Sequence, residues 1–221
     1  MEPDIVYEQA VALYDESIGE PDEAQRDRQL REAIALLQPT QTQSSQTADA
    51  LHLLGICWYD LSTGDEALDQ AKTAFVAALV REPNHQYANL FLGHVLFDTH
   101  QYDEALFYFG RVDPDYFAAR GQSWRGVKNS ELILCCRLAL NPADVTLDDI
   151  DRVCRQYERE PEIGVVPGEL TLSIDEVVAS AQLSGEQAAA YARRVLTMLE
   201  QTQNLSVRYL KATIARLSRL G

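Results

Sequence analysis

Two stretches of the chain repeat each other, and this repeat constrains the fold more than any other feature. Gly55 is followed ten residues later by Asp-Glu-Ala-Leu at residues 65–68, and Gly93 is followed ten residues later by the same tetrapeptide at residues 103–106. Self-similarity at a period of this length is typical of stacked helical repeats, in which each unit buries its apolar face against its neighbours. The sequence therefore predicts an all-α protein.

Within the repeat, small residues, large apolar or aromatic residues and a closing proline follow one another in the same order. The first unit carries Leu54, Gly55, Trp58, Ala67, Phe75, Ala78 and Pro83, and the second carries Leu92, Gly93, Leu96, Ala105, Phe109 and Pro114. Over residues 48–114 the chain resembles the tetratricopeptide repeat (TPR) family. The resemblance implies a right-handed superhelix of stacked antiparallel helix pairs. The second helix of the first unit is expected to be about two turns longer than its counterpart, from the spacing of its closing proline.

Outside the clear repeat, apolar residues at helical spacing predict further helices. Those over 4–17 and 23–37 are expected to form a degenerate first pair. A polar loop at 41–47 precedes the repeat, and helices at 115–127 and 130–140 follow it, with Asn129 or Ser130 as the N-cap between them. Thr146 and Asp149 predict a capping box that opens a helix over 147–158.

The segment 161–168 contains two prolines and two glycines, which exclude a regular helix. We therefore divide the chain into a TPR-like domain, 1–160, and a C-terminal helical extension, 161–221. The extension is predicted to hold helices over 174–181, 186–203 and 207–220, the second of them opened by a capping box of Ser184 and Gln187. The last helix is basic and amphipathic, and we expect it to dock on the acidic body.

Composition limits the classes of partner and of chemistry. The net charge of −15 disfavours nucleic acid and anionic membranes, and no run of about 18 apolar residues is present for a membrane span. The acidic N-terminus lacks the pattern of a signal peptide, so we expect a cytoplasmic protein. Four cysteines lack zinc spacing and are predicted to be small buried residues in a reducing compartment: Cys57, Cys135, Cys136 and Cys154.

No phosphate-binding loop or nucleophile motif occurs in the sequence, and the four histidines are not spaced to converge on one site. We therefore expect no enzyme activity, no cofactor and no metal. The TPR resemblance instead implies a protein- or peptide-binding scaffold or adaptor that uses its concave face. The alternative is a dedicated acidic inhibitor or chaperone of a basic partner, as in immunity proteins or secretion chaperones.

The resemblance also implies which side chains line the inner wall. They are His52, Ile56, Tyr59, Asp60, Tyr87, Leu90, His94, Phe97 and Asp98, and Asp49 would extend the same wall. Because no lysine-asparagine pair stands at the positions that clamp acidic peptides in the family, an apolar or basic segment is the expected partner. Two alternatives stay open: the chain's own terminal helix fills this wall, or a basic patch around Trp124 (Arg111, Arg120, Arg125 and Lys128) takes an acidic partner.

Overall fold

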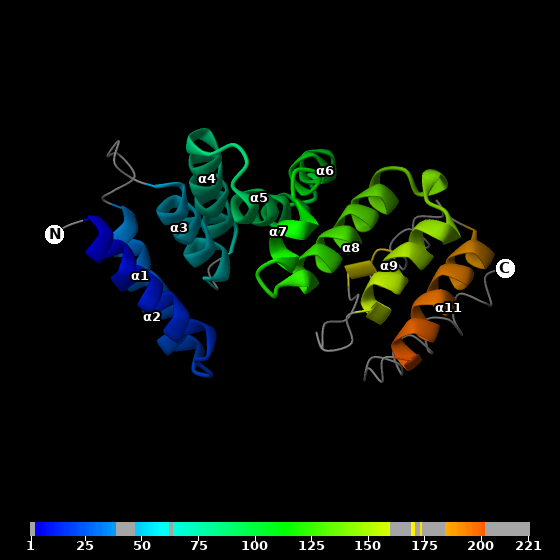
Figure 1. Ribbon diagram of the computed structural model, residues 1–221, viewed down its shortest axis with the longest axis horizontal. Coiled ribbons are helices and arrows are strands. Elements are labelled where there is room, and N and C mark those ends of the chain that lie inside the picture. The colour runs from blue at the N-terminus through cyan, green and yellow to red at the C-terminus, as the bar shows by residue number, and fades with distance from the viewer. Residues whose placement is uncertain are drawn as a thin grey trace. The chain divides into compact units, whose positions relative to one another are not determined.

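The computed structural model describes residues 3–38, 47–61, 64–159, 169–170, 173 and 184–201, and these residues form helices and no strand (Figure 1). The all-α prediction is confirmed for this part of the chain. The chain divides into two compact units, Met1–His100 and Gln101–Gly221. The second unit thus holds α11 of the predicted extension together with helices that we assigned to the repeat domain.

The first unit contains α1 (Pro3–Ile18), α2 (Glu23–Leu37), α3 (Ala48–Asp60), α4 (Asp65–Arg81) and α5 (Gln86–Asp98). Each helix packs on the next along the chain, and α3 also contacts α5. The helices predicted over 4–17 and 23–37 are confirmed. Asp22 caps α2 and Thr47 caps α3, each by accepting hydrogen bonds from backbone amides of the first turn.

The small residue of the first repeat marks a close approach of α3 and α4. A Cβ atom added to Gly55 would lie 2.5 Å from Cε1 of Phe75, whose side chain is fully buried. Real Cβ atoms do not approach a ring this closely, so any larger residue would displace Phe75. The predicted difference in helix length is also confirmed, because α4 has 17 residues and α6 (Tyr102–Phe109) has eight.

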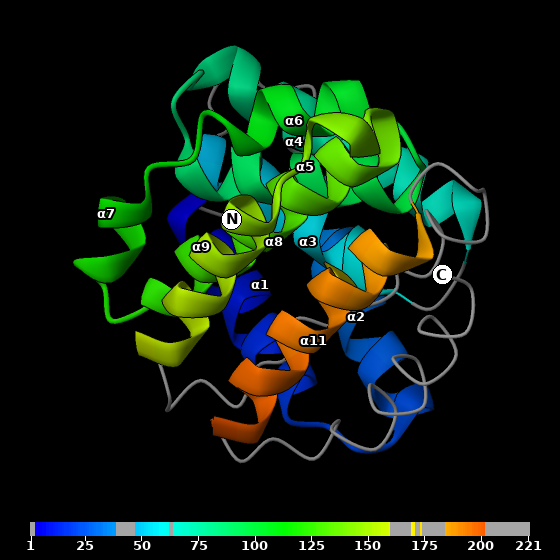
Figure 2. The same ribbon diagram turned by 90° about the vertical axis from the view of Figure 1, so that its right-hand side faces the viewer.

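After α6, the second unit continues with α7 (Pro114–Ala118), α8 (Ser123–Leu140), a 3-10 turn (Pro142–Asp144), α9 (Leu147–Arg159) and α11 (Gly185–Gln201). Helices α6 and α7 pack on α8, α8 packs on α9, and α9 packs on α11, so that α9 lies between α8 and α11 (Figures 1 and 2). The helix predicted over 147–158 is confirmed, and the one predicted over 186–203 is confirmed as far as residue 201, where the described part of the chain ends.

The predicted break at Asn129 and Ser130 is wrong, because α8 runs through both residues. The Asn129 side chain is buried and donates a hydrogen bond to the carbonyl oxygen of Phe109 on α6, 3.1 Å away. The Ser130 hydroxyl donates to the carbonyl oxygen of Gly126 in the preceding turn. Both side chains therefore bond inside the fold and leave the helix uninterrupted.

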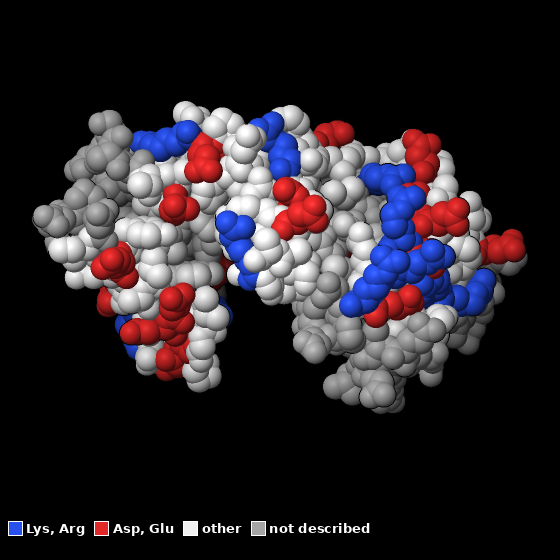
Figure 3. All heavy atoms as spheres, in the orientation of Figure 1, with Lys and Arg blue, Asp and Glu red and all other residues white. Residues whose placement is uncertain are grey.

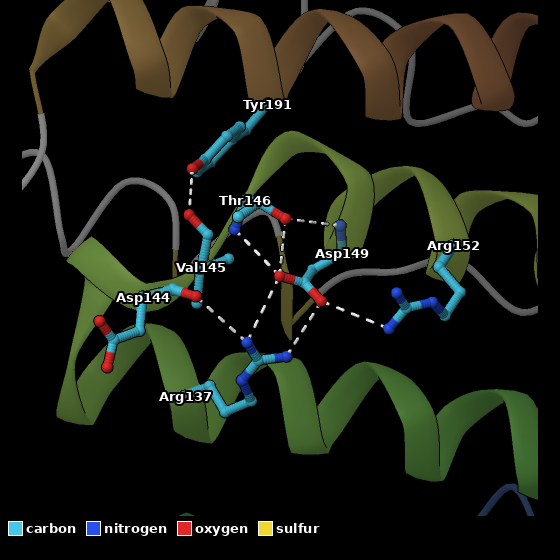
Figure 4. A network of polar contacts seen from close by, with 7 residues as sticks. All are labelled: Arg137, Asp144, Val145, Thr146, Asp149, Arg152 and Tyr191. Atoms are coloured by element: carbon cyan, nitrogen blue, oxygen red, sulfur yellow. Dashed lines mark hydrogen bonds and ion pairs between the residues drawn. The ribbon is translucent and has the colours of Figure 1, made fainter.

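The start of α9 is fixed by the network shown in Figure 4. The Asp149 carboxylate accepts from the backbone amide of Thr146 at 3.0 Å, and the Thr146 hydroxyl accepts from the amide of Asp149 at 3.3 Å, which confirms the capping box. Arg137 on α8 donates to both carboxylate oxygens of Asp149. The Tyr191 hydroxyl on α11 donates to the carbonyl oxygen of Val145 at 2.6 Å. These bonds tie α8, α9 and α11 together around one turn.

A buried carboxylate makes a second link in this unit. Glu131 on α8 is fully buried and accepts hydrogen bonds from the Tyr157 hydroxyl at 2.6 Å and from the backbone amide of Leu170 at 2.9 Å. Lys128 pairs with Glu131 at 2.8 Å and also with Glu169. Burial raises the pKa of Glu131 and these bonds partly lower it again, which leaves it above the ordinary value.

Several predictions fall outside the described residues. They are the loop over 41–46, the boundary segment 161–168, the helices over 174–181 and 207–220, and the docking of the last helix. Within the described part of the chain, no helix combines the length and the apolar character that crossing a membrane requires.

Candidate protein-binding surface

Half-buried aromatic side chains form a continuous surface across α3 and α5 in the first unit. We call it the α3/α5 aromatic surface, and it consists of His52, Tyr59, Tyr87, Phe91 and His94. The centroids of neighbouring rings lie 5.5 to 6.4 Å apart. Behind it, the buried ring of Phe75 stacks on Phe91 at 6.0 Å. Phe91 therefore packs on Phe75, whose ring in turn lies against Gly55 of α3.

The ring contacts show how α3 and α5 run. His52 contacts Tyr87 and Phe91. About two turns further along α3, Tyr59 contacts His94. The order of contacts is the same on both helices, so α3 and α5 lie side by side and parallel. The Tyr59 hydroxyl donates to the Asp98 carboxylate at 2.6 Å and fixes the C-terminal ends of the two helices to each other.

At the other end of the surface, His85 sets the beginning of α5. Its Nδ1 accepts a hydrogen bond from the backbone amide of Ala88 at 3.0 Å, which is the bond that an N-cap residue makes. Because Nδ1 is an acceptor, the ring proton of the neutral histidine is on Nε2, which donates to the Asp49 carboxylate at 3.0 Å. Asp49 itself remains largely exposed.

The structure brings five of the predicted wall residues together: His52, Tyr59, Tyr87, His94 and Asp98. Phe97 is half-buried on α5. Ile56 and Leu90 are only 6% and 2% exposed, so they belong to the core. Asp60 is exposed and accepts a hydrogen bond from the Tyr14 hydroxyl of α1 at 3.0 Å, so it contacts α1 and not the aromatic surface.

One residue of this surface, Phe91, and the neighbouring N-cap His85 were not among the predicted wall positions. Phe91 stands at its centre, four residues after Tyr87 and three before His94, which is the spacing of one helix face. This spacing can be read from the sequence, and it favours Phe91 over Leu90 as the surface residue on that face of α5. The cap made by His85 had no comparable signal, because histidine is not a preferred N-cap residue.

Charge is distributed unequally between the two units. Residues 1–100 contain 17 acidic and 5 basic residues, a net charge of −12, whereas residues 101–221 contain 17 acidic and 14 basic residues, a net charge of −3. Most of the chain's negative charge therefore belongs to the unit that carries the aromatic surface. Exposed carboxylates of Asp49 and Asp98 stand at its two ends.

The basic patch proposed around Trp124 is engaged within its own unit. Arg120 lies over the ring of Tyr116 at 3.5 Å and Arg125 over the ring of Trp124 at 4.4 Å. Lys128 is held by Glu131 and Glu169. These contacts account for the three side chains by intramolecular packing.

The thiols are placed for packing. All four cysteines are buried and free, as predicted. Burial, and to a smaller extent the charge of Asp60, raises the pKa of Cys57 to about 12, so its thiol is protonated at neutral pH and a poor nucleophile. Within the described residues, no three His, Cys, Asp or Glu side chains are grouped so that they could hold a metal ion.

No protein-family model matches this sequence, and no curated protein matches it either. The assignment to the TPR family therefore stays a prediction that rests on the repeat itself.

Proposed function

We propose that this protein is a non-catalytic binding scaffold or adaptor of the cytoplasm, and that the α3/α5 aromatic surface contacts a protein segment with basic and apolar side chains. The observation that carries the proposal is the row of half-buried rings with an exposed carboxylate at each end, on a unit of net charge −12. TPR-like superhelical stacking, with this surface on the concave side, is part of the same proposal.

The chemistry of the surface favours such a partner. Tyrosine and phenylalanine rings offer a large contact area while losing little side-chain entropy on binding. Their faces attract guanidinium groups by about 0.5–1 kcal/mol at exposed sites. Asp49 and Asp98 would pair with arginines at either end of the bound segment, and the net charge of the unit would speed its approach.

The unequal charge also supports the alternative function, an acidic inhibitor or chaperone that binds a basic partner chiefly by its charge. The two functions differ in what they require. A scaffold needs the aromatic side chains, whereas a charge-driven inhibitor needs the carboxylates and loses its affinity steeply as salt is added.

The test uses three fluorescein-labelled 12-residue peptides with the same leucines and with arginine, glutamine or glutamate at the other positions. Anisotropy is measured with the full chain and with the double variant Tyr59→Ala, Tyr87→Ala. We expect the arginine peptide to bind about tenfold or more tighter than the glutamate peptide, and the double variant to weaken it by about tenfold, since two aromatic contacts are lost.

Phe107→Ala is the matched control, because Phe107 is an exposed aromatic residue of the second unit, 59% exposed, and should change the affinity less than about twofold. Circular dichroism checks that each variant is folded, and His94→Ala replaces the double variant if that one is not. Unchanged arginine-peptide binding by a folded variant would exclude the aromatic surface. If binding also disappears in high salt, the charge-driven alternative is favoured.

A further inference from the structure

A groove runs along α8 in the second unit, with α9 on one side and α7 at one end. It consists of two hollows of about 170 and 230 Å³ that share Ser130 and Gln156. Along α8 the lining extends from Ser123 to Arg137. These fifteen residues of helix span roughly 21 Å, or about four turns. The groove is therefore long enough for a helical segment and too shallow and divided to enclose a compact small molecule.

The floor of the groove is apolar and its rim is basic. Val127, Leu134 and Val153 line the floor, and Ile133 stands beside them. Arginines form the rim: Arg137, Arg152 and Arg159. Figure 3 shows lysine and arginine side chains gathered over α8 and α9 on the face in view.

The two acidic residues of the lining do not cancel this charge. Asp149 already accepts from Arg137, Arg152 and the Thr146 amide, and its pKa is lowered to about 2, first by the hydrogen bond from Arg137. It therefore stays ionised and paired, while the side chain of Arg152 remains 70% exposed. Arg159 is exposed and makes no ion pair with any described residue. Asp115 stands at the far end, beside α7.

A polar atom in the middle of the groove is buried without a hydrogen-bond partner in the described part of the chain. The Oε1 atom of Gln156, which lines both hollows, is buried and accepts no hydrogen bond among the described residues. A buried acceptor without a donor costs about 1–3 kcal/mol. A ligand that brings an N–H or O–H donor to this point would remove that cost.

The spacing of the exposed arginines indicates the form of the ligand. Arg152 and Arg159 are seven residues apart on α9, which places them on the same face at a separation of roughly 10.5 Å. A helix with carboxylates seven residues apart has the same spacing, and its apolar stripe would cover the floor formed by α8. We propose that this groove binds an acidic amphipathic helix of another protein, with carboxylates opposite Arg152 and Arg159.

This site is independent of the α3/α5 aromatic surface, because it belongs to the other unit and prefers the opposite charge. The test uses a labelled 15-residue helical peptide that has a leucine stripe and glutamates seven residues apart, together with its glutamine counterpart. With the full chain, we expect the glutamate peptide to bind about tenfold tighter than the glutamine peptide in low salt, and this difference to shrink as salt is added.

The double variant Arg152→Glu, Arg159→Glu should lose about tenfold or more in affinity for the glutamate peptide. Arg155→Glu is the matched control: Arg155 is 64% exposed on the same helix, pairs with Asp151 and does not line the groove, so its reversal should change affinity less than about twofold. If the double variant does not fold, the single variant Arg159→Glu is measured in its place. Equal binding of the two peptides, or equal losses for Arg155→Glu and Arg159→Glu, would overturn the proposal.

Discussion

The two units of this chain use charge in different ways. Among the described residues of the first unit, ion pairs join Arg31 to Asp27 and His85 to Asp49. The core between its helices is apolar and aromatic, and the tyrosine hydroxyls of Tyr14 and Tyr59 donate to Asp60 and Asp98 at its edge. In the second unit, ion pairs connect the helices themselves. Most of the chain's net negative charge thus belongs to the first unit, whereas five of the described cations of the second unit form ion pairs within that unit.

The pairing of α9 with α11 shows this second use. Arg194 on α11 contacts Asp151 at 2.5 Å and Glu158 at 2.9 Å, both of them on α9. Together with the Arg137–Asp149 pair and the buried Glu131, charged bonds link α8, α9 and α11. Stability that depends on buried charge pairs is sensitive to the loss of one partner, because the other is left without compensation.

The largest effect is expected at Glu131. Glu131→Ala removes the acceptor of the Tyr157 hydroxyl and of the Leu170 amide and leaves both donors buried without a partner. We expect the free energy of unfolding of the second unit to fall by about 3–5 kcal/mol. Urea denaturation followed by tryptophan fluorescence measures this, since Trp124 belongs to the second unit and a Trp58→Phe background silences the first.

Arg31→Ala is the corresponding change in the first unit, where the pair with Asp27 is exposed. It should cost less than about 1 kcal/mol. Equal losses for Glu131→Ala and Arg31→Ala would show that the two units do not differ in their dependence on charge.

An intermediate effect is expected at Gly55, which tests the apolar packing of the first unit. Gly55→Ala places a methyl group against the buried ring of Phe75 and should cost about 1–3 kcal/mol. Gly19→Ala is its control, because nothing lies within 4 Å of a Cβ atom at that position. Trp58 fluorescence in a Trp124→Phe background reports the stability of this unit. A variant as stable as the Gly19→Ala protein would refute the close approach of α3 and α4.

A smaller effect than at Glu131 and Gly55 concerns acid stability at Asp149. Its pKa in the folded protein is lowered from 3.8 to about 2, so its contribution is complete above the unfolded value and is lost as the pH falls through about 2. We expect Asp149→Asn to be less stable than the parent by about 1–2 kcal/mol at pH 6. The difference should shrink between pH 4 and pH 2 in urea denaturation. A difference that is independent of pH would mean that the carboxylate's charge does not contribute.

Much of the fold could be predicted from local patterns in the sequence. The helices α1, α2, α9 and α11 follow from apolar spacing and caps, and the capping box at Thr146 is formed as expected. The close packing at Gly55 follows from the repeat. These features depend on residues near one another in the chain, where spacing alone determines which groups meet.

The features that escaped prediction depend on distant partners. Asn129 has the side chain of an N-cap, but the carbonyl group of Phe109, twenty residues earlier, accepts its hydrogen bond and keeps it inside α8. Leu90 was assigned to the binding wall by analogy with the repeat, but it is buried, and its neighbour Phe91 contacts the rings of the aromatic surface. The role of Asn129 could not be decided without the tertiary packing, whereas the spacing of Phe91 from Tyr87 and His94 already favours Phe91 over Leu90.

The buried thiols make the two units distinguishable to a chemical reagent. Cys57 is the single cysteine of the first unit, and Cys135, Cys136 and Cys154 belong to the second. All four are shielded, and burial raises the pKa of each above its ordinary value. Alkylation thus requires the surrounding helices to open, and the mass and position of the adduct record which unit opened and how often. The native cysteines therefore report the local unfolding of each unit, and no label has to be introduced.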